Sequence, residues 1–212
     1  YGYLLVTLVL FTSHIRDFFS VIFQIFSFDQ IVSKKNDIHP NEEYKVCALV
    51  PTYAEDYTLV KRNIDSLVDQ KLSKSTELVI MIVCDGLKIK APNKKPLFDY
   101  FDEDITFTNQ TIYKKKYRHW KNGKKVILYY KIGLYRDTKI ILAYKPKNLG
   151  KKDSLIIGEK VIEKLDINID FIYHTDSDTV ADKNCLNELQ KTLVADPKLD
   201  GCSGLVRAYY SR

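Results

Sequence analysis

Two aspartates, Asp176 and Asp178, lie two residues apart just after an apolar stretch at residues 167–174. If that stretch is a strand and the backbone stays extended beyond it, both carboxylates project from the same side of the chain. Carboxylate oxygens are the ligands that hard divalent cations prefer, and such a cation can bind a diphosphate. The spacing therefore predicts a metal site for a nucleotide-sugar, which points to a sugar transferase.

The same residue types also have a purely structural use. Asp, Ser and Thr are common in turns and helix caps, because their oxygens accept hydrogen bonds from exposed backbone N–H groups. Residues 175–179 (TDSDT) can therefore form a turn that has no chemical task. The rest of the chain has to decide between these two interpretations.

The chain around this pair alternates between predicted strands and helices. Apolar runs of β-forming residues predict buried strands at 45–50, where Pro51 ends the run, at 78–83 and at 167–174. Apolar residues recur at helical spacing over 56–72, over 151–165 and after Asp182 or Asn184, either of which can cap the last helix. A final strand is expected at 204–209. This alternation predicts an α/β protein with an open, mostly parallel sheet.

Three of these strands are expected to bring acidic or aromatic groups to one edge of the sheet. Ligands of open parallel sheets bind outside the carboxyl ends of the strands. Those ends carry residues 52–55 (TYAE), 84–86 (CDG) and 176–178 (DSD). The loop at 148–150 leads into a helix at Lys151 and Lys152, where helix N–H groups and ammonium groups favour an anionic phosphate.

A basic and aromatic segment, residues 88–144, lies between the two halves of this pattern. It contains two predicted strands, 126–132 and 139–144, joined by a turn near 133–137. Residues 114–121 (KKKYRHWK), with Lys124 and Lys125, are typical of a solvated loop or of a loop near anionic lipid headgroups. Basic residues interleaved with aromatic ones can also follow a nucleic-acid backbone, but we expect no nucleic-acid partner.

The composition is that of a globular domain with an ordinary core. The chain has 212 residues, of which 45% are hydrophobic and 28% charged, and its net charge of +6 suits an anionic ligand or a membrane surface. The four cysteines show no C-x-x-C spacing, so neither a zinc site nor a disulfide framework is expected, and a reducing compartment is favoured. Cys47 and Cys84 lie in apolar runs and are expected to act as small hydrophobic residues.

Residues 1–40 predict attachment to a membrane. Residues 1–11 and 18–28 are almost wholly apolar, but a spanning helix needs about 20 such residues. We interpret the first run as the end of a transmembrane helix and the second as an interfacial segment, with a buried core helix as the alternative. Lys34 and Lys35 favour the cytosolic side for the domain after them. Because the chain begins with Tyr1, we expect it to be a piece of a longer protein.

Five motifs in a fixed order carry a resemblance to a known family. They are residues 50–55 (VPTYAE), 63–67 (NIDSL), 83–86 (VCDG), 148–154 (NLGKKDS) and 176–179 (DSDT). Their order resembles the catalytic domain of chitin synthases, which are processive, membrane-bound, inverting family 2 glycosyltransferases. Residues 117–121 (YRHWK) also look like that branch of the family.

This resemblance implies the organisation and the activity of the chain. Residues 45–212 would be a Rossmann-like, GT-A type domain, incomplete at its C-terminal end, after a truncated membrane segment and linker at 1–40. The donor would be UDP-N-acetylglucosamine, the acceptor a β-1,4-linked chitin chain, and the cofactor Mn²⁺ or Mg²⁺. The protein would lie in the plasma membrane in contact with lipid, with its catalytic domain in the cytosol, and homo-oligomers would be allowed.

The resemblance also assigns roles to particular residues. The donor would be bound by residues at the strand ends and at the start of the second predicted helix, namely Pro51, Thr52, Tyr53, Glu55, Asp85, Lys151, Lys152, Asp153 and Asp176. Tyr53, Glu55 and Asp85 would bind the uridine, and Asp178 would bind the metal with Asp176. The structural alternatives are a surface aromatic for Tyr53, a turn for Asp85 and a helix-stabilising acid for Asp153.

The chain departs from the family pattern at several positions. Lys152 replaces the usual Arg, Ser177 the usual Ala and Leu205 a usual Glu. The family's general-base Asp and its Gln-x-x-Arg-Trp motif have no counterpart in the chain, so we expect it to hold donor and metal without completing transfer alone. The alternatives are another family 2 synthase, of the hyaluronan or cellulose type or making a short glycan, and an inactive, membrane-attached nucleotide-sugar-binding protein.

Overall fold

The computed structural model describes residues 15, 43–107, 111–165 and 167–204. The chain divides into two compact units, one of residues 40–187 and one of residues 1–39 and 188–212. Apart from Ile15 and Gly204, the expected membrane segment and the expected last strand at 204–209 lie outside the described residues. Within the described ranges, no helix is both long enough and apolar enough to cross a membrane.

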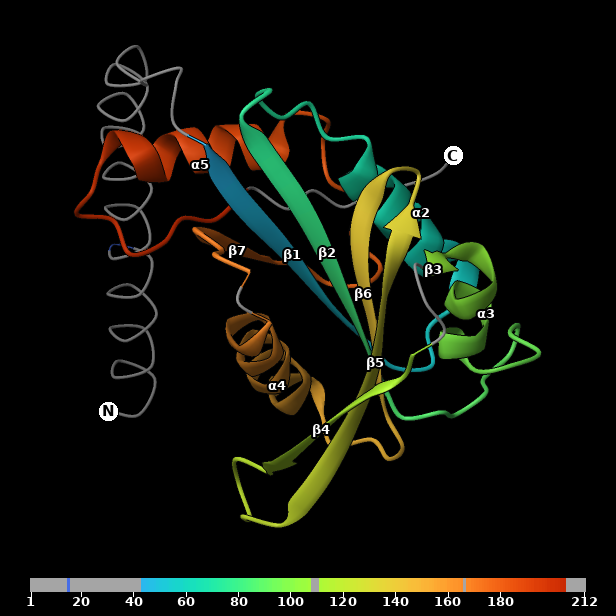
Figure 1. Ribbon diagram of the computed structural model, residues 1–212. Helices are drawn as coiled ribbons and strands as arrows, with labels where there is room; N and C mark the ends of the chain where they lie inside the picture. Colours follow the sequence, from blue (N-terminus) through green and yellow to red (C-terminus); the bar gives the residue numbers. More distant parts are fainter. Residues whose placement is uncertain (1–14, 16–42, 108–110, 166, 205–212) are drawn as a thin grey trace, which may run out of the picture. The chain divides into compact units, whose positions relative to one another are not determined.

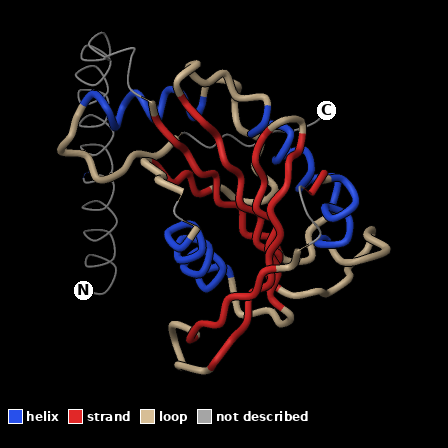
Figure 2. Tube along the Cα trace, viewed as in Figure 1, coloured by secondary structure: helices blue, strands red, loops and turns tan. Residues whose placement is uncertain are grey.

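The unit of residues 40–187 is built on one seven-stranded sheet (Figures 1 and 2). Four neighbouring strands are parallel, in the order β6 (Thr138–Lys145), β2 (Thr76–Asp85), β1 (Tyr44–Thr52) and β7 (Phe171–His174). Beyond β6 the sheet continues with antiparallel partners, because β5 (Lys125–Tyr135) pairs with β6, β3 (Thr106–Phe107) and β4 (Tyr113–Arg118). The predicted mixed α/β class with a mostly parallel sheet is confirmed.

Helices cover both faces of this sheet. Side chains alternate between the faces of a strand, so Ala48 and Val50 of β1 pack with α2 (Tyr57–Val68) and α3 (Leu97–Asp104). Cys47 and Leu49 pack on the opposite face with α4 (Lys151–Lys164). The central strands are therefore apolar on both sides, which is the pattern that the sequence indicated. The helix α5 (Cys185–Ala195) starts in this unit and continues into the other unit.

The bounds of the strands differ from the predicted ones for physical reasons. The prediction that Pro51 ends the first strand is wrong, since β1 runs to Thr52. Leu49 accepts a hydrogen bond from Thr175 on the β7 side, so the nitrogen of Pro51, two residues on, points to the same side. The pairing of β7 with β1 has ended at Leu49, and the missing N–H of the proline therefore costs no ladder bond.

The β7 strand is shorter than predicted because the Asp170 side chain takes the place of a backbone partner just before it. Lys45 donates its N–H to the Asp170 carboxylate (2.8 Å), and Asp170 donates its own N–H to the Lys45 carbonyl (2.9 Å). Strand pairing then begins at Phe171. The first helix is also shorter than predicted, since α2 ends at Val68, while Asp56 caps its start by accepting from Thr58 N (2.9 Å).

The basic middle segment contains elements that periodicity did not predict. The helix α3 is short and buries only Leu97 and Phe101. Residues 113–118 form β4, so the interpretation of the basic run as a loop is wrong for this part. The predicted pair of strands on either side of residues 133–137 is confirmed, with β5 extending to Tyr135.

The buried cysteines behave as the apolar sequence context indicates. Cys47 and Cys84 lie in the interior of β1 and β2, at 0% and 2% exposure. Burial raises the pKa of each thiol to about 12. Both side chains therefore stay protonated and pack as small hydrophobic groups.

Gly133 of β5 provides a test of how tightly β5 packs against β3 and the residue before it. A Cβ at this position would lie 2.7 Å from the Thr106 carbonyl oxygen and 2.8 Å from Ile105 Cγ2. We expect Gly133→Ala to lower the free energy of unfolding by about 1–3 kcal/mol, as overpacking does, when measured by urea denaturation. Gly201→Ala is the control, because a Cβ there meets no atom within 4 Å. Equal effects of the two substitutions would contradict the close approach.

Candidate functional site

The parallel strands bring their carboxyl ends to one edge of the sheet, as predicted. Thr52 of β1 lies opposite Cys84 of β2, and Asp85 lies opposite Lys145 of β6. On the other side of β1, β7 ends at His174, and the aspartate pair begins two residues later. The edge therefore carries four strand ends, where the sequence predicted three.

The aspartate pair lies in a turn, so the expected extended backbone is wrong. Thr179 donates its N–H to the Asp176 carbonyl (3.1 Å), which closes the turn over residues 176–179. Asp176 and Asp178 are nevertheless both exposed, while Ser177 between them is buried. The turn thus offers two carboxylates to solvent, and the metal role predicted for them remains a prediction.

Polar side chains of α2 and the residues just after it hold this turn in place. The Asn63 amide, fully buried, donates to the carbonyl oxygens of Asp176 (3.2 Å) and Thr179. Ser66 accepts from Ala181 N (3.0 Å), and Gln70 donates to the Asp182 carbonyl (2.6 Å). The sequence motif at 63–67 had no assigned role, although polar residues at positions 63, 66 and 70 follow the spacing of one helix face.

A buried cation, Lys145, lies between two buried carboxylates behind the edge. Its side chain is 0% exposed, and its Nζ lies 2.9 Å from Asp85 Oδ1 and 3.1 Å from Asp153 Oδ2. Asp85 also accepts hydrogen bonds from the backbone of Leu149 (2.8 Å) and Gly150 (2.7 Å). Asp85 therefore fixes the loop that leads into α4, and its predicted contact with uridine stays a prediction.

Asp153 belongs to the first turn of α4 but points into the protein. It is 1% exposed and accepts a hydrogen bond from the Tyr117 hydroxyl (2.7 Å), while His119 Nε2 lies 3.6 Å from its other oxygen. Burial, followed by the contact with Asp153, raises the pKa of Tyr117 well above its usual value. The phenol therefore remains a hydrogen-bond donor. Asp153 links α4 to the hairpin of β4 and β5, and its predicted donor contact remains untested.

The two lysines at the start of α4 are exposed and have different partners. Lys151 pairs with the Asp176 carboxylate, and both groups are 58% exposed. Lys152 places its Nζ 4.1 Å from the centre of the Trp120 ring. The predicted phosphate-binding lysines thus lie beside the aspartate turn and beside the hairpin. Residues 117–121, noted for their resemblance, contact residues 152 and 153 of the other motif.

The segment after β1 gives a mixed result for the remaining predicted donor residues. Tyr53 is 37% exposed and donates its N–H to the Glu55 carboxylate, while Ala54 between them has a φ of 35°. Pro51 and Thr52 are buried. Tyr53 therefore offers its ring to solvent as predicted, whereas a donor would reach Pro51 and Thr52 only after a rearrangement or through neighbouring groups.

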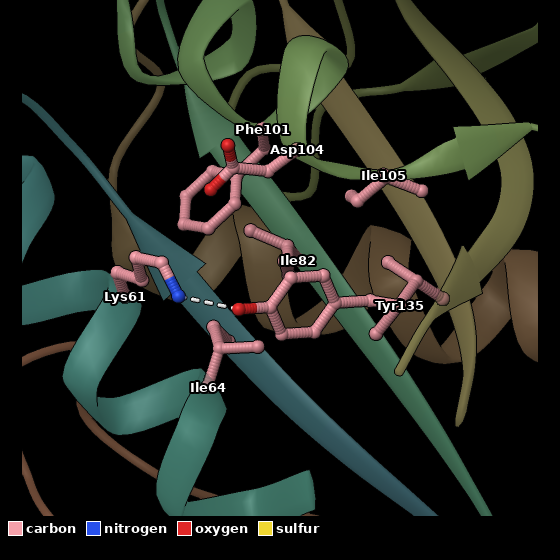
Figure 3. A pocket seen from close by; sticks show the side chains of 8 residues that line it. Lys61, Ile64, Ile82, Phe101, Asp104, Ile105 and Tyr135 are labelled. Atoms are coloured by element: carbon pink, nitrogen blue, oxygen red, sulfur yellow. Dashed lines mark hydrogen bonds between the residues drawn. The ribbon is translucent and has the colours of Figure 1, made fainter. Parts of the chain in front are cut away.

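The described residues include one small pocket that lies away from this edge (Figure 3). It lies between α2, α3 and the sheet, and Lys61, Phe101, Asp104 and Tyr135 contribute to its wall. None of the predicted donor or metal residues lines it. Nor do the described residues contain a group of three or more His, Cys, Asp or Glu side chains that could hold a metal by themselves.

Comparison with known proteins gives a consistent answer across most of the chain. The chain is 26% identical to chitin synthase 8 of Gibberella zeae, in an alignment that covers 79% of the chain and 29% of that protein. It is also 26% identical to chitin synthase 8 of Verticillium dahliae, covering 81% of the chain and 33% of the relative. The chain is similar to chitin synthases. This confirms the resemblance carried by the five motifs.

A third relative extends this similarity and also shows how much of a chitin synthase the chain represents. Chitin synthase csmA of Aspergillus niger is 22% identical over 81% of the chain and 13% of its own length. The chain thus spans about a third or less of the chitin synthases that it matches. No protein-family model matches the chain.

The cluster around Lys145 predicts a large cost for removing its charge. Lys145→Met would leave Asp85 and Asp153 buried without their cation, and we expect the free energy of unfolding to fall by about 3–5 kcal/mol. Urea denaturation at neutral pH measures the change. Adding Asp153→Asn should recover part of the loss. Lys139→Met, at the opposite end of β6, should change stability by less than about 0.5 kcal/mol; a similar loss in both variants would contradict the role of Lys145.

Asn63 predicts a local effect on the aspartate turn. Asn63→Ala removes the donor shared by two carbonyl groups, and we expect a loss of about 1–3 kcal/mol in unfolding free energy. Amide hydrogen exchange should become faster at Thr179 and Ala181, because the turn is less well held. Asn187→Ala is the control, since no hydrogen bond of its side chain is described. Unchanged exchange at both amides would show that Asn63 does not hold the turn.

Proposed function

We propose that the unit of residues 40–187 is the donor-binding part of a GT-A type glycosyltransferase of the chitin synthase kind. The similarity to chitin synthases indicates a glycosyltransferase. The observation that carries the proposal is the Lys151–Asp176 pair, which joins the start of α4 to the exposed aspartate turn. Groups suited to a phosphate and groups suited to a cation thereby lie side by side at the carboxyl edge of a parallel sheet.

The start of α4 is suited to a diphosphate. Its first N–H groups and the ammonium groups of Lys151 and Lys152 favour negative charge. Gly150 at the N-cap has a φ of 93°, and a Cβ there would meet no atom within 4 Å. A phosphate group can therefore approach the backbone at this point. In the proposal, Lys151 exchanges its contact with Asp176 for a contact with the donor phosphate.

The aspartate turn is suited to a metal that is shared with the donor. Asp176 and Asp178 supply two exposed carboxylates, and Mg²⁺ or Mn²⁺ bound in this way usually completes its coordination with water and substrate phosphates. The Lys151 ammonium already lies against Asp176, which indicates that positive charge is favoured there. When bound, the metal would neutralise negative charge on the leaving nucleoside diphosphate.

The remaining residues would orient the donor. Tyr53 offers an exposed ring for a nucleoside base, with Glu55 close by as an acceptor. Asp85 and Asp153 would position the donor indirectly. Both are buried and hold in place the loop before α4 and the first turn of α4. We assign this unit to donor binding and not to proton transfer from the acceptor.

The proposed donor is UDP-N-acetylglucosamine and the proposed acceptor is a growing chitin chain. The complete protein would be located in a membrane, with this unit in the cytosol, where nucleotide-sugars are supplied. These proposals rest on the similarity to chitin synthases over about 80% of the chain. Competition between UDP-sugars for the site would distinguish chitin synthesis from the synthesis of hyaluronan or cellulose.

Calorimetry with UDP and UDP-N-acetylglucosamine tests the metal and the donor together. Binding should require Mn²⁺ or Mg²⁺ and should be lost on chelation. Asp178→Asn should lower the affinity at least about tenfold in the presence of metal. Even residues that only hydrogen-bond to a metal ligand change metal affinity by about that factor when they are replaced. Asp137→Asn, at the turn between β5 and β6, is the matched control. Binding that does not depend on metal would refute the metal site, and no binding of either ligand would refute the donor site.

A further inference from the structure

The hairpin of β4 and β5 has one face that the proposed function does not use. Seven of the thirteen residues at 113–125 are Lys or Arg, and no Asp or Glu occurs between Asp104 and Asp137. The hairpin extends away from the centre of the sheet in Figure 1. Its charge is therefore not offset by acidic residues of its own sequence.

Strand pairing sorts these residues onto two faces. In the antiparallel register, Tyr117 lies opposite Val126 and Lys115 opposite Leu128. Tyr117 and Leu128 pack against the core on the α4 side. Because neighbours along a strand alternate, the opposite face carries Lys114, Lys116, Arg118 and Lys125.

The four cations on this face lie on two paired strands, and none has an acidic partner among the residues that the structure describes. Arg118 lies directly opposite Lys125, and like charges in such a cross-strand pair destabilise a sheet. All four residues are exposed, and none forms an ion pair with another described residue. Within the described part of the chain, no acidic side chain offsets this repulsion.

The aromatic residues of the hairpin show which kind of anion this face suits. A nucleic-acid strand would need open rings on which bases can stack. Tyr113 is already stacked on Tyr130 (5.2 Å between ring centres), and Tyr129 on Tyr144 (5.1 Å). Tyr117 is turned towards Asp153. These rings therefore already have partners within the protein, and Lys114 Nζ also lies 5.7 Å from the centre of the Tyr129 ring. Among the described residues, the four charges have no acidic partner.

We propose that this basic face, defined by Lys114, Lys116, Arg118 and Lys125, binds an anionic lipid bilayer. A flat row of lysine and arginine side chains matches a layer of lipid headgroups, which attracts each basic residue without specific pairing. Trp120, in the turn of the hairpin, is 47% exposed, but its ring contacts Lys152 on the α4 side, so the proposal rests on the basic residues alone. The other face of the same hairpin contacts Asp153 and Lys152, so the bilayer contact would lie next to the start of α4.

Vesicle co-sedimentation of the 212-residue chain tests this proposal. Vesicles of phosphatidylcholine alone are compared with vesicles that also contain phosphatidylserine, so that any binding through apolar segments is common to both. The wild-type chain should bind the phosphatidylserine vesicles more tightly, and added salt should remove the difference. The variant K114Q/K116Q/R118Q/K125Q should lose this difference, at about fivefold per charge removed.

A matched variant separates the effect of the basic face on vesicle binding from the effect of the chain's net charge. K88Q/K90Q/K160Q/K164Q removes the same number of exposed positive charges elsewhere and should keep the phosphatidylserine dependence. K114R/K116R/K125R should also keep it, because the charge is unchanged. Circular dichroism checks that each variant folds. If the quadruple hairpin variant unfolds, the single variants K116Q and R118Q provide the comparison.

Three results would overturn the proposal. One is an equal preference for phosphatidylserine in the hairpin variant and the wild type. Another is an equal loss in the matched variant, which would assign the effect to net charge. The third is tighter binding to an RNA or DNA oligonucleotide than to phosphatidylserine vesicles, abolished by the hairpin substitutions, which would assign the face to nucleic acid. Each is independent of UDP binding, so failure here leaves the proposed function in place.

Discussion

The ion cluster centred on Lys145 is the interaction on which the rest of the carboxyl edge depends. A fully buried ammonium is stable only with buried carboxylates close by, and Asp85 and Asp153 supply them from β2 and α4. Asp85 also binds the backbone of residues 149 and 150, and Asp153 binds the hairpin through Tyr117. One cation thereby connects two strands, a loop, a helix start and the hairpin. The positions of Lys151 and Lys152 depend on it.

The aspartate turn is held from the opposite face of the sheet. Asn63, Ser66 and Gln70 bind the backbone of residues 176–182, so the turn is fixed through its carbonyl and N–H groups. This leaves the carboxylates of Asp176 and Asp178 exposed to solvent. Support of the backbone by a neighbouring element is a common way to present side chains that must bind a ligand. Lys145 and Asn63 lie on opposite faces of the sheet. Lys145 supports the start of α4 and Asn63 supports the aspartate turn, and these two segments contact each other through the Lys151–Asp176 pair.

In the hairpin of β4 and β5, alternate residues of the short segment 113–119 face either the protein interior or solvent. Tyr117 and His119 face α4 and contribute to the interior, whereas Lys114, Lys116 and Arg118 face solvent. The alternation of a strand explains why such a basic run is compatible with an ordered fold. It also explains how the same residues can fix the start of α4 on one side and present charge on the other.

Much of the fold was predictable from local sequence. The buried strands at the centre of the sheet are continuous apolar runs, and the main helices show clear periodicity, so their types and order can be read from residue patterns alone. The short elements α3 and β4 were not predictable in this way. The former buries only two residues, and the latter is mostly charged. Their conformation depends on packing against the rest of the sheet.

The sequence by itself determined which chemical groups lie at the edge, because strand ends and helix starts can be located from residue types. Placement at a strand end did not decide exposure, since Asp176, Asp178 and Tyr53 are exposed whereas Thr52 and Asp85 at the same edge are buried. Only the tertiary structure decided that Asp85 and Asp153 point inwards to Lys145, and that Asn63 holds the aspartate turn. Those contacts join residues far apart in the chain, and a buried charge depends on the partners that folding brings to it. No local pattern contains that information.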